Sequence, residues 1–282
     1  MIEHFHYFGS RLRRSRAFRP YDGIWQRLSP AWQRLHGLLA RRGLPTQINQ
    51  DVFRLSIVIG SRYGRHAPRE YEAVFYGAFA DAIRPGMTVF DVGAHVGLFT
   101  LAAAKRVGGG RVYAFEPTEA SADAIATHLA LNRWQDRAEV VRAVVSDSEG
   151  TRSFFTTGTT TAASIARENL EPPLNRELLN TPVREVAMPA ITIDGFAARI
   201  GRSPDVIKID AEGAESLVLA GARDVLATGR AVILCEVHPQ QMRHCGSSLT
   251  QLQDFVAGAG CRMDALDAPN DAGAFHVRIA RR

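Results

Sequence analysis

Residues 87–100 read MTVFDVGAHVGLFT, and the pattern changes twice within this short stretch. β-Branched and aromatic residues come first, followed by an acid and two glycines four residues apart, and then by an apolar run of helical composition. This order predicts a strand, a tight glycine loop and a helix. Glycines allow a positive φ or a ligand lying against the backbone, and the free N–H groups that open the helix can bind ligand oxygens.

The spacing of this loop discriminates between ligands. Asp91-x-Gly93-x-x-x-Gly97 does not fit the G-x-G-x-x-G fingerprint of dinucleotide-binding loops, which argues against a hydride-transfer enzyme. Asp91 would repel a pyrophosphate, whereas it suits a ligand that carries positive charge. S-adenosyl-L-methionine (SAM) is such a ligand, because it has sulfonium and ammonium groups and no phosphate. A glycine turn that merely closes a strand–helix unit is the structural alternative.

Length, hydropathy and cysteines limit the class of protein. A chain of 282 residues can form one large α/β domain or such a domain with an appendage. We expect no transmembrane helix, because no apolar stretch approaches the ~20 residues required, and no secretory signal precedes the first arginines. Three cysteines, an odd number, suit free thiols in a reducing compartment, so the expected location is cytoplasmic.

The positive charge is concentrated near the N-terminus. The net charge is +5 overall, and residues 1–45 alone hold nine arginines against two acids. Apolar residues recur at spacings of three and four over residues 24–39, which predicts helices with one apolar face. We therefore expect a basic helical extension over residues 1–50 and a main domain over residues 51–282. The extension could contact nucleic acid or an anionic membrane surface, but a solvated or dimerising arm is the simpler interpretation.

Two further strands are predicted to end in polar residues. Residues 111–115 form the second strand of the core and end at Glu116-Pro117, and Glu116 lies 19 residues after Gly97. An acid at this place binds a ribose diol in doubly wound folds, although an exposed glutamate at a strand end is the alternative. A third strand over residues 138–145 places Ser146 and Asp147 beside an adenine.

The second half of the chain repeats this arrangement. The strand that begins at residue 205 ends in Asp210, and Glu212 follows two residues later, before a glycine and a helix. Ligands bind outside the carboxyl ends of the strands in such sheets, so both acids are expected in the crevice that holds the acids of the first two strands. Residues 157–182 form the longest irregular stretch and are a candidate lid over the acceptor.

The C-terminal part predicts the edge of the sheet. Residues 231–239 read as a buried strand with Glu236 and His238 at its tip. Residues 261–266 and 274–279, joined by a turn that contains proline, asparagine and glycine, read as a closing hairpin.

Four motifs in this order resemble the FkbM family of SAM-dependent methyltransferases: Asp91–Gly97, Tyr113–Pro117, Ile207–Glu215 and Cys235–His238. The resemblance covers about residues 50–260. It implies a class I methyltransferase fold, which is a Rossmann-like three-layer α/β sandwich whose seven-stranded, mostly parallel sheet has one antiparallel strand from the C-terminal hairpin. His95 stands where such proteins often have Asn, and Ala211 stands where the motif usually has Val, but neither change removes a ligand group.

The resemblance also implies site residues. SAM would be bound by Asp91, Gly93, Ala94, His95, Gly97, Glu116, Pro117, Ser146 and Asp147. The catalytic side would consist of Asp210, Glu212 and His238, with Asp210 or His238 as the base. No metal ligand is assigned, although an alternative places Mg²⁺ on Asp210 and Glu236 to lower the pKa of the acceptor hydroxyl.

The expected reaction is O-methylation of a hydroxyl on a small molecule, sugar, glycan or lipid. SAM is already an activated electrophile, so the protein has to align the hydroxyl and take up its proton. A non-catalytic SAM-binding scaffold that acts through the basic extension and an RNA methyltransferase are the alternatives. The slightly acidic main domain argues against RNA. The chain could form a homodimer, and the sequence does not identify the acceptor.

Overall fold

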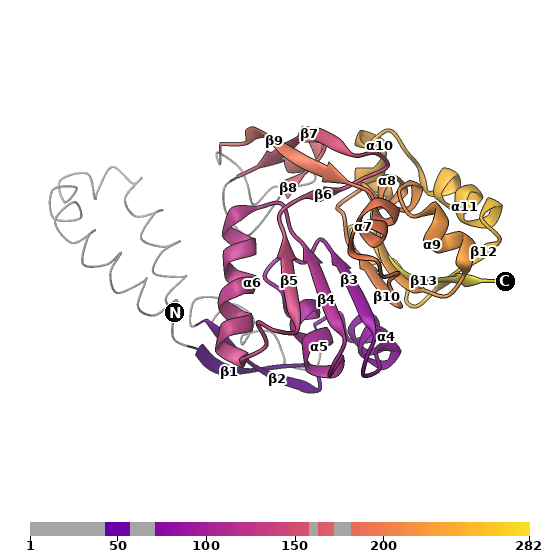
Figure 1. Cartoon of the computed structure of the whole chain (residues 1–282). Coiled ribbons are helices and arrows are strands. Elements are labelled where there is room, and N and C mark those ends of the chain that lie inside the picture. The colour runs from indigo at the N-terminus through magenta and orange to yellow at the C-terminus, as the bar shows by residue number, and fades with distance from the viewer. Residues whose placement is uncertain (1–42, 57–70, 158–162, 172–181) are drawn as a thin grey trace, which may run out of the picture. The chain divides into compact units, whose positions relative to one another are not determined.

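The computed structural model describes residues 43–56, 71–157, 163–171 and 182–282 (Figure 1). Most of the predicted basic extension and most of the predicted lid lie outside these residues, so both stay predictions, as does the domain boundary at residue 50. The chain divides into two compact units. Residues 1–73 and 127–133 form one unit, and residues 74–126 and 134–282 form the other.

The first unit contains a β-hairpin. β1 (Gly43–Ile48) pairs with β2 (Asp51–Ser56) in antiparallel register. Asn49 has a φ of 48° in the two-residue turn, a conformation that asparagine tolerates. Arg54 N–H donates to Asn132 Oδ1 at 2.9 Å, and Asn132 Nδ2 donates back to Arg54 O at 2.9 Å, which fixes the hairpin to residues 127–133.

The second unit is built on a seven-stranded sheet with the order β12-β13-β11-β10-β3-β4-β5. Its strands are β3 (Thr88–Val92), β4 (Arg111–Phe115), β5 (Ala138–Val141), β10 (Val206–Ile209), β11 (Val232–Val237), β12 (Cys261–Ala265) and β13 (Phe275–Arg281). Within this sheet the pairing is parallel except around β13, which runs antiparallel to both of its neighbours. The predicted class I methyltransferase topology is therefore confirmed.

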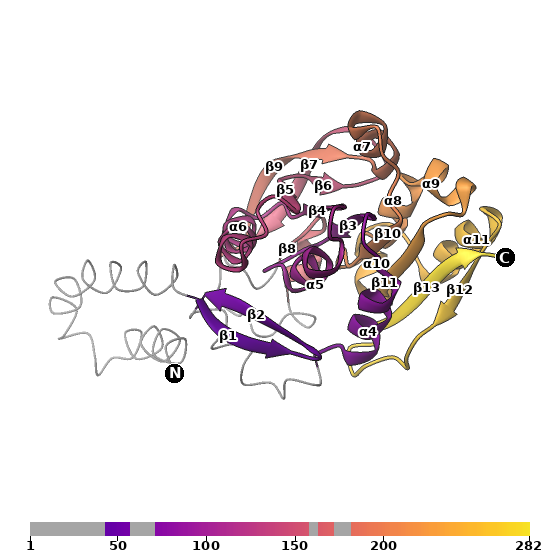
Figure 2. The ribbon, with the colours of Figure 1, turned by 60° about the horizontal axis from the view of Figure 1, so that its bottom comes forward.

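Helices lie on both faces of this sheet (Figures 1 and 2). They are α4 (Ala73–Ala82), α5 (Leu98–Arg106), α6 (Glu119–Asn132), α7 (Ile193–Ile200), α8 (Glu215–Ala220), α9 (Arg223–Thr228), α10 (Pro239–His244) and α11 (Leu249–Gly258). The helices α7, α8, α9 and α11 share one buried apolar cluster with the strands. On this face Phe196 of α7 packs edge-on against Phe90, Tyr113 and Phe115, with ring centroids 4.9–5.5 Å apart. Each such aromatic pair stabilises the core by about 0.5–1.5 kcal/mol beyond area burial.

The opposite face is covered by α4 and α5. Phe99 of α5 packs against Phe75, Tyr76 and Phe79 of α4, with ring centroids 5.2–5.5 Å apart. These side chains are fully or almost fully buried, so the two helices close the third layer of the sandwich. None of the helices in the described part of the chain is both long enough and apolar enough to cross a membrane.

A smaller sheet lies beside the carboxyl end of β5. Its strands follow the order β6-β9-β7-β8. They are β6 (Val144–Val145), β7 (Gly150–Thr156), β8 (Ala163–Ser164) and β9 (Arg184–Ile191). The 3₁₀ helix η2 (Arg167–Leu170) lies between β8 and β9 in the sequence. The predicted strand over residues 138–145 is therefore two strands in two sheets. The strand β9 was not predicted, because most of its residues are exposed or half-buried and its apolar pattern is weak.

Candidate active site

The glycine loop between β3 and α5 needs its glycines for two different reasons. Gly93 has a φ of 70°, and a Cβ at this position would lie 1.8 Å from the backbone oxygen of Asp210 at the end of β10. Gly97 has a φ of 86° and its added Cβ would lie 3.0 Å from the Ile125 side chain. His95 also has a positive φ, of 51°, although it is not a glycine. The positive φ angles and the close packing together explain why glycine occupies positions 93 and 97.

Glu116 is held at the end of β4 by this loop and by its own turn. Its Oε2 accepts from His95 N at 2.9 Å, and its Oε1 accepts from the Thr118 N–H at 2.8 Å and from the Thr118 hydroxyl at 2.5 Å. Glu116 is 6% exposed. Burial raises the pKa of Glu116, while these hydrogen bonds favour the charged form and oppose the rise. The carboxylate is therefore fixed in one orientation before any ligand binds.

Asp91 is directed into the protein. It is fully buried, accepts a 2.6 Å hydrogen bond from the Thr100 hydroxyl, and lies 3.5 Å from Lys208 Nζ. Lys208 is also 3.4 Å from Asp210 Oδ2 and donates to Gly93 O at 2.8 Å. Burial raises the pKa of Asp91, and Lys208 opposes this rise. The sequence analysis missed Lys208, although one charge inside the buried strand Val206–Ile209 was a signal that could have found it.

A cavity of about 160 Å³, part of it open to solvent, lies at the carboxyl ends of β3, β4 and β10. Six predicted site residues line this cavity: Gly93, His95, Glu116, Pro117, Asp210 and Glu212. In the described structure the other six predicted residues are not among those that line it: Asp91, Ala94, Gly97, Ser146, Asp147 and His238. The cavity is therefore lined both by Glu116, which was predicted to bind the cofactor, and by Asp210 and Glu212, which were predicted to be catalytic.

Ser146 and Asp147 do not line the cavity, although Val144 and Val145 of β6, directly before them, do. The strand β5 stops at Val141, and Ala143, two residues later, lines the cavity. Asp147 is exposed and pairs with Arg152. Partial burial acts to raise the pKa of Asp147, but the charge of Arg152 outweighs it and the pKa is lowered. The assignment of both residues to adenine stays a prediction that the geometry does not favour.

His238 follows β11 and lies among four carboxylates. Its Nδ1 is 2.9 Å from Oε1 of the fully buried Glu215, and its Nε2 is 3.5 Å from Glu236 Oε1, 3.8 Å from Glu212 Oε2 and 4.0 Å from Asp210 Oδ1. Burial acts to lower the pKa of His238, but the hydrogen bond to Glu215 and the negative charges raise it well above the ordinary value. The surrounding negative charges therefore favour the protonated form of His238.

The two carboxylates that line the cavity differ in their surroundings. Burial acts to raise the pKa of Asp210, but the charges of Lys208 and His238 outweigh it and lower the pKa. The pKa of Glu212 is raised by partial removal from water and by neighbouring carboxylates, against the opposing charge of His238. Glu212 has a φ of 47°, and its carbonyl accepts a 3.0 Å hydrogen bond from Asn169 Nδ2. Asp210 is therefore the more strongly ionised of the two.

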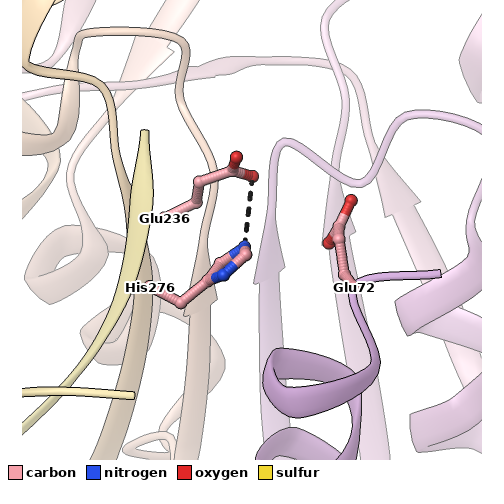
Figure 3. A group of neighbouring side chains, drawn as sticks. All are labelled: Glu72, Glu236 and His276. Carbon is pink, nitrogen blue, oxygen red and sulfur yellow. Dashed lines mark ion pairs between the residues drawn. The ribbon is translucent and has the colours of Figure 1, made fainter. Parts of the chain in front are cut away.

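Glu236 connects His238 to a second imidazole. Its Oε2 lies 3.8 Å from His276 Nε2, and the two side chains point toward one another in Figure 3. His276 Nδ1 is 2.6 Å from Asp267 Oδ2, and its ring stacks on Phe75 with centroids 4.2 Å apart. The chain of carboxylates and imidazoles thus extends from the cavity edge to the antiparallel strand β13.

Comparison with known families agrees with this geometry. The family model described as the methyltransferase FkbM domain matches residues 91–263, which begin at Asp91 and include the glycine loop, Glu116, Asp210 and the strand tip before His238. The protein is thus a methyltransferase of the SAM-dependent class. The chain belongs to the FkbM family.

The individual relatives share less than a third of their aligned residues with this chain. The chain is 29% identical over 223 residues to the 31-O-demethyl-FK506 methyltransferase FkbM of Streptomyces tacrolimicus, covering 71% of this chain and 82% of that protein. It is 28% identical over 237 residues to the AMB antimetabolite synthetase AmbE of Pseudomonas aeruginosa, of which it spans only 11%. A solved methyltransferase FkbM from Methylobacillus flagellatus KT is 15% identical with a TM-score of 0.47, covering 92% of this chain and 60% of that one.

Proposed function

We propose that the protein transfers the methyl group of SAM to a hydroxyl oxygen of a small-molecule, sugar, glycan or lipid acceptor. The observation that carries this proposal is the cavity itself, because it places Glu116 beside the glycine loop and Asp210 and Glu212 in the same space. The name of the Streptomyces tacrolimicus relative describes transfer to an oxygen, which supports the choice of a hydroxyl acceptor.

The residues at the cavity fit the cofactor half of this reaction. Glu116 is a fixed carboxylate that can accept hydrogen bonds from two ribose hydroxyls. Gly93 leaves no room for a side chain, so the backbone forms the wall of the cavity there. Phe115 and Ala143 add an apolar surface suitable for adenine. Asp91 acts indirectly in this proposal, because it holds Lys208, which in turn binds the Gly93 carbonyl.

Asp210 would act on the acceptor, as the base that takes up the proton of its hydroxyl group. When bound, SAM would supply an electrophilic methyl group, and S-adenosylhomocysteine would be the leaving group. Asp210 remains charged, lines the cavity and can accept the hydroxyl hydrogen bond and then the proton. His238 is a weaker choice of base, because its pKa is raised well above the ordinary value and it is 5% exposed. It holds the carboxylates in place instead.

The first experiment separates cofactor binding from transfer. Calorimetry measures binding of SAM and S-adenosylhomocysteine to the wild type, Glu116→Ala and Asp210→Asn, and mass spectrometry scores methyl addition to a panel of hydroxyl compounds. We expect Glu116→Ala to lose binding, and Asp210→Asn to bind normally but to transfer about 10²–10⁴-fold more slowly. The matched control is Asp271→Asn, which changes an exposed residue of the C-terminal hairpin turn.

Other outcomes would favour the alternatives. Failure of the wild type to bind SAM would refute the proposal. SAM binding without turnover, together with loss of cellular function on removal of residues 1–45 but not on Asp210→Asn, would favour a scaffold. Methylation of RNA oligonucleotides in the panel would favour an RNA methyltransferase. A cytoplasmic location and a homodimer stay predictions.

A further inference from the structure

One side-chain cluster at the cavity edge has the composition of a metal site. His238, Asp210 and Glu212 each offer one ligand atom, and these atoms lie within 4.8 Å of one another. Nε2 of His238 is 3.8 Å from Glu212 Oε2 and 4.0 Å from Asp210 Oδ1. These separations are too long for hydrogen bonds, but they are close to those between ligands that share one ion at about 2.0–2.2 Å. We propose that Asp210, Glu212 and His238 bind a divalent transition-metal ion, for which Mn²⁺ serves as the probe.

The orientation of His238 supports this proposal independently of the carboxylates. The side chain is 6% exposed, and Nδ1 is engaged by Glu215 at 2.9 Å, so Nε2 is the nitrogen directed at Asp210 and Glu212. A carboxylate that binds the far nitrogen of an imidazole is the usual support of a metal-bound histidine. Glu215 is itself fully buried and accepts from Gly213 N at 2.9 Å, so this support is rigid. The imidazole is thus held with one nitrogen aimed into the cluster.

The local charge also favours a cation. Glu236 Oε1 lies 3.5 Å from the same Nε2, so four carboxylates surround one imidazole when Glu215 is included. The ammonium nearest to them, that of Lys208, is shared between Asp210 and the buried Asp91. A divalent ion would offset this excess of negative charge where water is partly excluded.

The donor set selects among ions. Mg²⁺ prefers oxygen ligands alone, whereas catalytic Zn²⁺ sites combine histidine with carboxylates, and Mn²⁺ accepts carboxylate oxygens. One imidazole with two carboxylates therefore favours a transition-metal ion over Mg²⁺. Asp210 and Glu212 line the cavity, so the ion would lie at its edge.

The use of the ion, unlike its binding, rests on the proposed function. An acceptor hydroxyl that binds the ion would have a lower pKa. Asp210 would then be a ligand rather than the base, and the proton would leave to water at the exposed side of Glu212, whose side chain is 56% exposed.

The test measures binding directly. The full chain is treated with EDTA, desalted and titrated with MnCl₂, and free Mn²⁺ is followed by electron paramagnetic resonance. We expect one ion per chain with a micromolar Kd, and binding at least about 100-fold weaker in His238→Gln and Glu212→Gln. Glu185→Gln, which changes an exposed glutamate of β9, is the matched control and should bind as the wild type does. Competition with Mg²⁺ and Zn²⁺ tests the order of preference.

The outcomes distinguish this inference from the proposed function. Absence of binding below about 1 mM Mn²⁺, or equal binding by both variants and the wild type, would overturn the site. Glu212→Gln keeps the test sound if His238→Gln fails to fold, because Glu212 is more than half exposed. Calorimetry with SAM on the same metal-free protein gives the separate answer. SAM binding without Mn²⁺ binding refutes only the ion, whereas Mn²⁺ binding without SAM binding refutes only the methyl transfer.

Discussion

Replacing Glu116 by glutamine should weaken SAM binding while leaving the fold intact. The carboxylate is held by three hydrogen bonds from His95 and Thr118, and the amide keeps its size but loses the charge and one acceptor oxygen. A hydrogen bond to a charged group stabilises by about 1.5–3 kcal/mol, and each 1.4 kcal/mol is a factor of ten. We therefore expect the Kd for SAM to rise about 10- to 150-fold if one ribose hydroxyl loses its charged partner.

The pH dependence gives a second test of the same carboxylate. Burial raises the pKa of Glu116, so the charged form that binds the ribose is lost at a higher pH than for an ordinary glutamate. Affinity for SAM should fall as the pH is lowered through this raised pKa, and Glu116→Gln should lack that part of the change. The sign for stability is opposite. A raised pKa in the folded state means that the buried charge costs stability at neutral pH, so the stability contributed by this group in the ligand-free wild type should increase as the pH is lowered through the raised pKa.

Calorimetry at several pH values between 5 and 8, with thermal unfolding of the ligand-free protein, provides both measurements. Glu119→Gln is the matched control, because it makes the same chemical change three residues later on a side chain that is 75% exposed. Its Kd should equal that of the wild type. If Glu116→Gln binds SAM within twofold of the wild type at neutral pH, the assignment of Glu116 to the ribose is wrong.

Three other predictions test packing and charge. Gly93→Ala should lower the free energy of unfolding by about 2–4 kcal/mol in urea titrations, because its Cβ would lie 1.8 Å from a backbone oxygen. Gly77→Ala on α4 is the matched control: its Cβ would meet no described atom within 4 Å, so it should raise the free energy of unfolding by up to about 1 kcal/mol. Lys208→Met should lower the free energy of unfolding by about 3–5 kcal/mol, because it removes the ammonium that pairs with the buried Asp91 carboxylate. Adding Asp91→Asn should recover part of that loss, whereas additive losses in the double variant would contradict the pairing. Burial raises the pKa of Cys245 to about 12, so alkylation at pH 8, followed by mass spectrometry, should be about 10³-fold slower in the folded than in the unfolded chain; equal rates would contradict burial.

The main sheet could be predicted because its strands carry strong signals. Parallel strands buried on both faces read as continuous apolar runs, and glycines or acids mark where they end. The hairpin strand β1 and the strand β9 were missed for the opposite reason. β1 contains proline and polar residues, and β9 is exposed or half-buried along most of its length, so neither shows a clear apolar pattern.

The site was predictable only to the level of strand ends. Glu116 and Asp210 were placed correctly at the cavity because carboxyl ends of neighbouring parallel strands meet at one edge. Side-chain direction was not predictable, since Asp91 turns inward only because Lys208 lies on the adjacent strand. The break between β5 and β6 was not predictable, because apolar residues on both sides of it hide the change from one sheet to another after Val141.

The contact between Gly93 and the Asp210 carbonyl has a consequence for enzyme engineering. Backbone meets backbone there, so the spacing between the cofactor half and the acceptor half of the proposed reaction is set by the main chain. Phe154 and Ile165, in contrast, reach the cavity from β7 and from the segment after β8, outside the main sheet. Libraries of variants at those two positions should therefore change which acceptors fit while the distance between methyl donor and acceptor oxygen stays constant.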